Sequence, residues 1–375
     1  MNTHFYYGTL CHPPLLAKVL GRDVTTEAAR LPGHAVFWAA DGAYPVIVEK
    51  GAGADGVLLR GLGAEDQARL DFYEGGFGYH RRIVTVETST GPVEALVYFP
   101  EPGRVRPAAP WRLSDWLDRW GAVAIAAAGD FMREFGRLDG ERLGRRYPMM
   151  LMRAGARVRA EAESLVPSLR RAAQQGDVAE TSARQVYANY FAVEEYELRF
   201  RRFDGAMSPE VNRAVFVSGD AAVVLPYDPV RDRVLVIEQF RMGPHGRGDP
   251  QPWLVEAIAG RVDGGETPET AALREAREEA GLEVRELIAV ASYYPSPAML
   301  AEYLYTYVGL ADLPDGAAGI GGLPGEAEDI RAHLLSFDRL MELVASGEVN
   351  NAPLLILAYW LDRNRSDIRG RAAGA

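Results

Sequence analysis

Residues 260–282 read GRVDGGETPETAALREAREEAGL, and the second half of this stretch carries the signals of a helix. Thr267 can cap the helix through its hydroxyl, and the proline that follows is favoured at a first helical position because its missing N–H would be unpaired there anyway. Gly281 can end the helix in a left-handed conformation. The spacing therefore predicts a helix over Pro268–Ala280, about three and a half turns long.

Three glutamates crowd the C-terminal part of this predicted helix, namely Glu275, Glu278 and Glu279. Each like-charged pair three or four residues apart costs about 0.2–0.5 kcal/mol in an isolated helix. The negative end of the helix dipole adds a penalty of similar size, which Arg274 and Arg277 offset in part. Charge spacing alone is more typical of a solvated surface helix. A divalent cation among the carboxylates would explain the crowding, and oxygen ligands suit Mg²⁺ or Mn²⁺.

The whole stretch also matches a longer pattern, G-x5-E-x7-R-E-U-x-E-E-x-G-U, with a small apolar residue at the first U. Its members are Gly260, Glu266, Arg274, Glu275, Ala276, Glu278, Glu279, Gly281 and Leu282. This pattern resembles the Nudix box. The resemblance implies an α/β/α sandwich and an enzyme that cleaves nucleoside diphosphates linked to another moiety, with Mg²⁺, or alternatively Mn²⁺, as its cofactor.

The resemblance also implies roles for individual box residues and for the residue before the box. Glu275 and Glu279 would be metal ligands, together with the backbone carbonyl of Ala259. Glu278 would support them, and Arg274 would orient them. These roles are carried over from the family and depend on the match of the motif.

Beyond the box, residues 183–365 resemble the bacterial ADP-ribose pyrophosphatases. Pro297 lies 16 residues after the box glycine Gly281, which is the spacing that marks ADP-ribose use in that group. Glu326 and Glu328 match an acidic loop, in which the first glutamate would activate the water and the second would complete the metal site. An acidic surface loop is the simpler alternative for these two residues.

Four further residues match substrate contacts of the same group. Arg213 and Arg241 would hold the diphosphate, because guanidinium forks bind phosphate in a bidentate way. Tyr190 would stack on adenine across a swapped homodimer, and Glu302 would lie on the substrate side. The sequence departs from the family here, since SPAMLAE at 296–302 replaces the glycine-containing SPGGTSE.

This resemblance implies cleavage of ADP-ribose to AMP and ribose 5-phosphate, with a small nucleotide as the substrate partner and a homodimer formed through the Nudix domain. Two alternatives stay open. One is GDP-mannose or another nucleotide sugar as substrate, because those hydrolases share much of the layout. The other is a non-catalytic ADP-ribose sensor, which the intact metal-binding glutamates argue against.

The first part of the chain reads as short strands separated by turns, typical of a small β-barrel. Helical periodicity follows at 111–138, where Trp116, Trp120, Ile125 and Phe131 can share a face, and a second helical stretch is expected at roughly 153–174. The polar segment 173–182 is the predicted linker. The predicted domains are therefore 1–172 and 183–375.

The N-terminal stretch FYYGTL and the stretch LDFYEGGFGYHRR at 70–82 together resemble the γ-glutamylcyclotransferase-like (AIG2-like) family over residues 3–100. The resemblance implies that the loop Tyr7, Gly8, Thr9 and Leu10 binds a substrate carboxylate through backbone N–H groups, and that Glu74, in the turn formed by LDFYEG, shuttles a proton. A barrel kept as a non-catalytic module is the alternative. The combination with a Nudix domain resembles bacterial proteins described as tellurite-resistance-associated.

Composition limits the other classes of function. The chain has 375 residues, a net charge of −11 and a single cysteine, Cys11. The acidic balance and the absence of a Lys/Arg block argue against a nucleic-acid partner. No basic segment precedes an apolar run at the N-terminus, and the apolar run at 122–129 is too short to span a bilayer. We therefore expect a cytoplasmic protein with no membrane partner.

Overall fold

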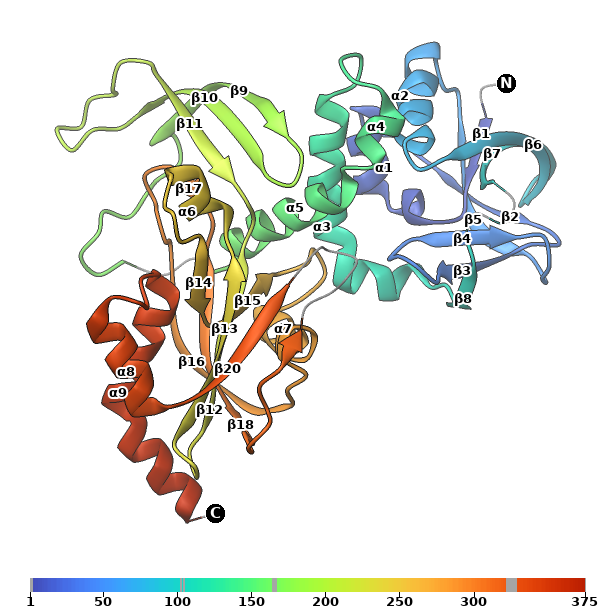
Figure 1. Ribbon diagram of the computed structural model, residues 1–375. Helices are drawn as coiled ribbons and strands as arrows, with labels where there is room; N and C mark the ends of the chain where they lie inside the picture. Colours follow the sequence, from blue (N-terminus) through green and yellow to red (C-terminus); the bar gives the residue numbers. More distant parts are fainter. Residues whose placement is uncertain (1–2, 102, 104, 164–166, 322–328, 375) are drawn as a thin grey trace. The chain divides into compact units, whose positions relative to one another are not determined.

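The computed structural model describes residues 3–101, 103, 105–163, 167–321 and 329–374. The chain divides into two compact units, Met1–Ser164 and Leu165–Ala375, each with its own sheets and helices (Figure 1). The predicted linker segment 173–182 falls within the second unit, and strand β9 (Val178–Ala188) begins inside it.

The first unit is built around a closed five-stranded barrel in the order β1-β5-β2-β6-β7. Its strands are β1 (Thr3–Tyr6), β2 (Glu27–Leu31), β5 (Ala54–Arg60), β6 (Tyr79–Thr88) and β7 (Gly91–Pro100). A three-stranded sheet accompanies it, with β4 (Pro45–Val48), β3 (Ala35–Ala39) and β8 (Pro107–Pro110) in that order. Phe5, Leu58 and Val97 are buried in one apolar cluster of the barrel. The predicted barrel is thus confirmed, while β2 and β8 are additional strands.

The helices of this unit share a second apolar core. They are α1 (Pro13–Leu20), α2 (Ala64–Gly75), α3 (Leu113–Arg133), α4 (Gly140–Gly144) and α5 (Tyr147–Ala162), with a short 3₁₀ turn η1 (Thr9–Cys11). Leu70, Trp116 and Phe131 are buried together in this core. The second predicted helix was placed too late in the chain, because α5 spans 147–162 rather than 153–174.

Two glycines allow helix α4 to lie directly on the end of α2. A Cβ atom on Gly144 would lie 1.8 Å from the carbonyl oxygen of Gly76, and a Cβ atom on Gly140 would lie 2.7 Å from the carbonyl oxygen of Phe72. Only glycine permits such close backbone approach. The last turn of α2 is therefore held by backbone contact with α4.

The second unit contains an eight-stranded mixed sheet and a smaller four-stranded sheet. The large sheet runs β16-β18-β12-β13-β20-β19, with β14 paired to β13 and β15 paired to β12, and the small one runs β17-β11-β10-β9. The strands are β10 (Ala192–Phe200), β11 (Val211–Val217), β12 (Ala221–Asp228), β13 (Arg233–Phe240), β14 (Trp253–Glu256), β15 (Ile258–Arg261), β16 (Val284–Tyr293), β17 (Leu300–Ala301), β18 (Leu304–Ala311), β19 (Ile320–Gly321) and β20 (Ile330–Ser336). The helices are α6 (Met242–Arg247), α7 (Pro268–Ala280), α8 (Phe337–Ser346) and α9 (Ala352–Ala373).

Helices cover both faces of the large sheet, as expected for an α/β/α sandwich (Figure 1). On one face α7 packs through Ala272 and Ala276 against Val224 and Leu235. On the other face α8 and α9 pack through Leu340 and Leu357 against the opposite side of the sheet. The predicted sandwich is therefore confirmed.

Strands β12 and β13 form a hairpin, with Tyr227 opposite Val234. Its turn is held by Asp228, which is 1% exposed and accepts hydrogen bonds from the backbone N–H groups of Val230, Arg231 and Leu313. Before this hairpin, β9 turns into β10 near Asn189, and β10 turns into β11 near Asp204.

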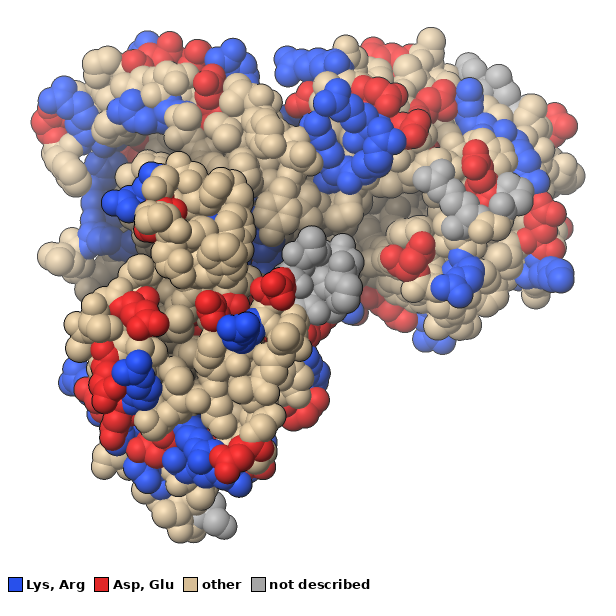
Figure 2. All heavy atoms as spheres, in the orientation of Figure 1, with Lys and Arg blue, Asp and Glu red and all other residues tan. Residues whose placement is uncertain are grey.

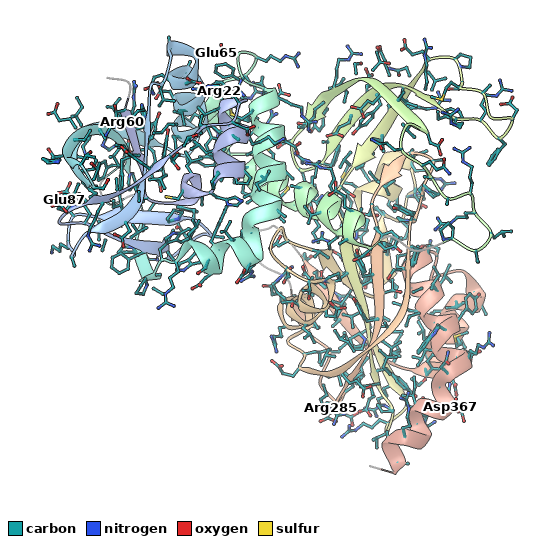
Figure 3. The ribbon with its side chains drawn as sticks, turned by 180° about the vertical axis from the view of Figure 1, so that it is seen from behind. Arg22, Arg60, Glu65, Glu87, Arg285 and Asp367 are labelled. Carbon is teal, nitrogen blue, oxygen red and sulfur yellow. The ribbon has the colours of Figure 1, made fainter. Side chains whose placement is uncertain are left out.

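None of the helices in the described ranges combines the length and hydropathy needed to cross a bilayer. On the face in Figure 2, basic and acidic side chains are interspersed. Many of them form exposed pairs, which contribute little to stability. One such pair in the first unit joins Arg60, which is labelled in Figure 3, to Glu27 at 2.8 Å, with both side chains exposed.

Candidate active sites

Helix α7 carries the glutamates of the first candidate site and has the bounds that the sequence predicted. The Thr267 hydroxyl accepts a hydrogen bond from the backbone N–H of Thr270 at 3.2 Å, which caps the helix. Pro268 takes the first helical position, and Gly281 ends the helix with φ 63°. These caps fix where the helix starts and stops, and so fix which of its residues face the sheet.

The guanidinium of Arg274 connects three carboxylates. It donates to Glu275 at 2.6 Å, to Glu278 at 2.9 Å and to both oxygens of Glu266 at 3.0 and 3.1 Å. A further hydrogen bond goes to the carbonyl of Arg261 at 3.0 Å. Burial lowers the pKa of Arg274, but the hydrogen bonds and charges of Glu266 and Glu275 raise it by more, so the guanidinium stays charged. Arg274 therefore offsets the repulsion among the helix carboxylates.

Gly260 leaves the space that the Glu275 carboxylate occupies. A Cβ atom at position 260 would lie 1.8 Å from Oε1 of Glu275, so any larger residue would displace this carboxylate. Glu279 lies beside the same strand, is 3% exposed, and accepts a hydrogen bond from the backbone N–H of Ala259 at 3.4 Å. Two carboxylates and the backbone at 259–260 are thus brought together, and such an oxygen-rich donor set fits Mg²⁺ or Mn²⁺.

Glu326 and Glu328 lie outside the described residues, but the flanks of their segment are placed. Gly321 in β19 pairs with Ile330 in β20, and a Cβ atom on Gly321 would lie 2.1 Å from the carbonyl oxygen of Glu279. Both flanks are therefore anchored at the C-terminal end of α7. Over the described ranges, no three His, Cys, Asp or Glu side chains converge closely enough to hold a metal ion.

A second group of side chains lies next to the box and includes a residue that the sequence did not single out. The Arg261 guanidinium carbon lies 3.8 Å from the ring centroid of Tyr190, and its Nη1 donates to the Tyr190 carbonyl at 3.1 Å. Tyr190 is 66% exposed, so it is not a core residue. Arg261 occupies a variable position of the box pattern and therefore gave no signal in the sequence.

Glu302 belongs to the same region. The Ser218 hydroxyl donates to Glu302 Oε1 at 2.9 Å. Burial raises the pKa of Glu302, while the Ser218 hydrogen bond and the charge of Arg261 act in the opposite direction. The structure therefore brings Tyr190 and Glu302 near one another through Arg261.

The remaining predicted substrate contacts are more dispersed. Arg213 lies exposed on β11 and donates to the carbonyl of its neighbour Asn212. Arg241 follows β13 on the other sheet and pairs with Glu256 at 2.7 Å. Pro297 lies in an exposed turn just before β17, which pairs with β11. The two arginines are thus on different sheets and do not form one pair in this structure.

The first unit contains a second candidate site, a cavity of about 600 Å³. Its lining includes the predicted loop Tyr7, Gly8, Thr9 and Leu10 together with Glu74. Gly8 packs tightly, since a Cβ atom there would lie 2.4 Å from Cγ of Pro45. Two distant stretches of sequence thus meet in one cavity. Glu74 is in the last turn of helix α2, so the segment that the resemblance describes as a turn is helical.

Two polar groups face this cavity without partners among the described residues. Burial raises the pKa of Glu74 to about 7, and no described group donates a hydrogen bond to its carboxylate. The Tyr6 hydroxyl is buried and also lacks a partner in the described part of the chain. A buried hydroxyl without a partner is rare in folded proteins, and a carboxyl with a strongly raised pKa in a cavity is a sign of a ligand or functional site. Tyr6 was missed because a lone aromatic residue in a strand is normally part of the core.

Comparisons with known proteins agree with the division of the chain into two units. The family model described as "NUDIX domain" matches residues 217–356, and the model "Gamma-glutamyl cyclotransferase, AIG2-like" matches residues 4–118. An ADP-ribose pyrophosphatase of Escherichia coli (strain K12) is 40% identical over 197 residues, covering 52% of this chain and 93% of the relative.

Two further relatives match the same part of the chain. An ADP-ribose pyrophosphatase of Haemophilus influenzae is 34% identical over 197 residues, covering 52% of this chain and 90% of the relative. A GDP-mannose pyrophosphatase of Enterobacter sp. (strain 638) is 30% identical over 173 residues, covering 46% of this chain and 88% of the relative.

The glutamate-bearing helix, the sandwich around it and the match to nearly the whole length of these relatives define the class of protein. The chain belongs to the Nudix hydrolase family, whose members generally depend on a divalent metal. Its first unit is a γ-glutamylcyclotransferase AIG2-like domain.

Proposed function

We propose that the second unit hydrolyses the diphosphate of ADP-ribose to AMP and ribose 5-phosphate with Mg²⁺, or alternatively Mn²⁺. The observation that carries this proposal is the arrangement around Arg274, in which one guanidinium orients Glu275 and Glu278 at 2.6 and 2.9 Å next to the space left by Gly260. The relatives named as ADP-ribose pyrophosphatases support the choice of substrate.

Four groups would hold the metal. They are the carboxylates of Glu275, Glu279 and Glu328 and the backbone carbonyl of Ala259. When bound, a divalent ion supplies charge neutralisation at the diphosphate oxygens and lowers the pKa of coordinated water. In the described structure Glu275 is held by Arg274, and Glu279 by the backbone N–H of Ala259 on β15, which pre-organises both carboxylates for this task.

The remaining chemistry falls to side chains that act directly on water and substrate. Glu326 would take a proton from the attacking water as general base. Glu278 would support the metal ligands, and Arg274 would position all of them. The anchored flanks of the 322–328 segment, at the end of α7, support this role for Glu326.

The substrate would also be held by a second set of residues, which are not metal ligands. Tyr190 would stack on the adenine ring, and its exposure supports this role. Arg213 and Arg241 would bind the diphosphate, and Glu302 would contact the terminal ribose near Pro297. Adenine stacking across a swapped homodimer through this unit would bring Tyr190 of one copy to the site of the other.

A turnover assay on the full chain tests this proposal. We expect Mg²⁺-dependent release of AMP from ADP-ribose, and we expect Glu279→Gln to lower kcat by at least about a hundredfold with little loss of stability. Glu283→Gln is the matched control, because Glu283 lies just past the same helix, is 74% exposed and pairs only with Arg277 among the described residues. Full activity of Glu279→Gln would overturn the proposed metal site.

The same assay distinguishes the two alternatives. Faster release of GMP from GDP-mannose than of AMP from ADP-ribose would favour the nucleotide-sugar function, which the Enterobacter relative makes relevant. Binding of ADP-ribose without turnover of either compound would favour a sensor.

We further propose that the first unit is a γ-glutamylamine cyclotransferase, with a non-catalytic binding module as the alternative. The unpaired Glu74 carboxylate, with a pKa of about 7 in the same cavity as the loop Tyr7–Leu10, favours catalysis, because such a group can both accept and return a proton near neutral pH. The backbone of Tyr7–Leu10 would bind the substrate carboxylate. Release of 5-oxoproline from a γ-glutamyl amide, lost in Glu74→Gln, is the expected result.

A further inference from the structure

The cavity of the first unit is completed by helices that the family model does not cover. That model ends at residue 118, near the start of α3. The wall of the cavity continues through the rest of α3 and through α4 and α5. The side chains that this extension contributes include Trp120, Ala124, Tyr147, Pro148 and Leu151. The extension therefore determines which molecules fit in this part of the cavity.

The wall formed by the extension is mainly apolar and aromatic. Its two charged residues, Glu141 and Arg145, pair with each other at 3.1 Å, and both are at least 70% exposed. Charges that are paired and solvated in this way offer little to a ligand. Against the rest of this wall, where the Tyr147 hydroxyl is already hydrogen-bonded with Tyr73, a polar or charged substituent would lose most of its hydration, whereas an apolar one would gain from burial.

The polar groups of the cavity that lack partners among the described residues lie outside this extension. Glu74 comes from α2, and the Tyr6 hydroxyl, buried without a partner among the described residues, comes from β1. The loop Thr9–Cys11 opens on the same cavity. A glutamyl group is small relative to a cavity of about 600 Å³, which is in the range that holds drug-sized ligands. When the glutamyl part of a ligand lies near Glu74 and the loop Thr9–Cys11, a large apolar space lined by α3–α5 remains for the amine part.

We propose that the first unit acts on γ-glutamyl amides whose amine part is bulky and apolar, and that the α3–α5 extension selects that part. This inference rests on the cyclotransferase function proposed above. In the reaction the α-amino nitrogen of the substrate attacks its own γ-carbonyl carbon. A new C–N bond closes the 5-oxoproline ring, and the bond from that carbon to the leaving nitrogen breaks. Two protons pass from the α-ammonium group to the leaving nitrogen, carried by Glu74, and nothing is oxidised or reduced.

The test compares three substrates with the 375-residue chain. Two of them are the γ-glutamyl amides of phenethylamine and of methylamine. The third is the γ-glutamyl amide formed with the side-chain nitrogen of lysine. We expect kcat/KM for 5-oxoproline release to be at least about tenfold higher for the phenethylamide than for either other compound, since an apolar pocket discriminates by this much for even a small change in buried surface.

Variants test whether the α3–α5 extension determines the preference for an apolar amine part. Leu151→Trp fills the apolar space and should bring the ratio of kcat/KM between phenethylamide and methylamide toward one. Leu169→Trp, at a side chain that is 96% exposed, is the matched control and should keep the wild-type ratio. If Leu151→Trp does not fold, as judged by circular dichroism, Trp120→Ala removes apolar wall instead and should also lower the ratio.

The outcomes separate this inference from the function on which it rests. Equal rates for the three compounds, or a preference for the lysine compound, would overturn the inference and leave the cyclotransferase function standing. No 5-oxoproline from any compound would overturn the cyclotransferase function. In that case calorimetric titration tests whether the cavity still prefers a bulky apolar amine part. Tighter binding of the phenethylamide than of the methylamide supports this preference, and equal binding overturns it.

Discussion

Gly260 shows how one missing side chain can set the geometry of a metal site. Its backbone is not in the left-handed region, so alanine is tolerated by the backbone itself. The difficulty is steric, because a Cβ atom would lie 1.8 Å from the Glu275 carboxylate. The box glycine therefore acts through the position of Glu275, which the spacing in the sequence does not reveal.

We expect Gly260→Ala to lower kcat for ADP-ribose by about a hundredfold, because a displacement of about 1 Å in a catalytic group has that effect. The measurement is steady-state kinetics at saturating Mg²⁺. Gly370→Ala in α9 is the control, since no atom beyond its chain neighbours and its own helical backbone lies within 4 Å of the Cβ position there, and it should leave kcat unchanged. Wild-type kcat in Gly260→Ala would contradict this account of the site.

The raised pKa of Glu74 leads to a second prediction, which concerns how the unfolding free energy depends on pH. Burial raises its pKa to about 7, whereas an unfolded glutamate titrates near ~4.3. The folded protein thus binds the proton on Glu74 more tightly than the unfolded chain does. The resulting contribution to stability is fully present below pH ~4.3 and is lost as the pH rises through about 7. Between pH 5 and 8 we expect the wild type to lose on the order of 2 kcal/mol of unfolding free energy relative to Glu74→Gln.

Urea unfolding of both proteins at several pH values measures this difference in slope. The absolute stability of Glu74→Gln is not the readout, because the buried amide has its own cost. Parallel pH profiles for the two proteins would show that Glu74 is not titrating in a buried environment.

At the scale of elements, the turn between β12 and β13 depends on Asp228. Burial raises the pKa of this carboxyl, but hydrogen bonds from the backbone and guanidinium of Arg231 and from the N–H groups of Leu313 and Val230 lower it by more. The folded pKa is therefore below its ordinary value. The contribution to stability is present above the unfolded pKa, ~3.9, and is lost as the pH falls through the lower folded value.

We expect Asp228→Asn to lower the unfolding free energy by about 2 kcal/mol at pH 7, with the difference from wild type narrowing near pH 3. Thermal unfolding at the two pH values measures it. Asp315→Asn is the matched control: Asp315 pairs with Arg233 at 2.6 Å but is 92% exposed, so a change of less than about 1 kcal/mol is expected. A loss in Asp228→Asn that is equal at both pH values would contradict the proposed role of its charge.

The elements also show what the sequence could and could not predict. The bounds of α7 were predictable because Thr267, Pro268 and Gly281 each carry a local signal. Strand β2 has the sequence EAARL, with no β-branched or aromatic residue, and β8 has two prolines. Both form because the barrel and the small sheet supply partners, and such tertiary contacts override local propensity. Arg261 was missed for a similar reason, since only the fold brings it to Tyr190.

At the scale of the whole molecule, each unit has apolar clusters of its own. We therefore expect two calorimetric unfolding transitions in the full chain. Mg²⁺ with a non-hydrolysable ADP-ribose analogue at a hundred times its Kd should stabilise one transition by about 2.7 kcal/mol. A γ-glutamyl amide should shift only the other.

A single transition that moves with either ligand would show that the two units unfold together. The sequence separated the two functions through two motifs, but it did not indicate that α3–α5 line the cavity. Helical periodicity identifies a buried face and does not distinguish a face buried in a core from one that lines a cavity.

The backbone contact between α4 and the end of α2 has a consequence for how this protein can vary. Gly140 and Gly144 are close to backbone atoms of Phe72 and Gly76 that cannot move aside as a side chain would. Among random substitutions selected for function, these two positions should accept almost none, while the exposed Arg142 between them should accept many. Natural variation in this helix would therefore be confined to its outer face, with Glu74 kept in place by residues that carry no chemistry of their own.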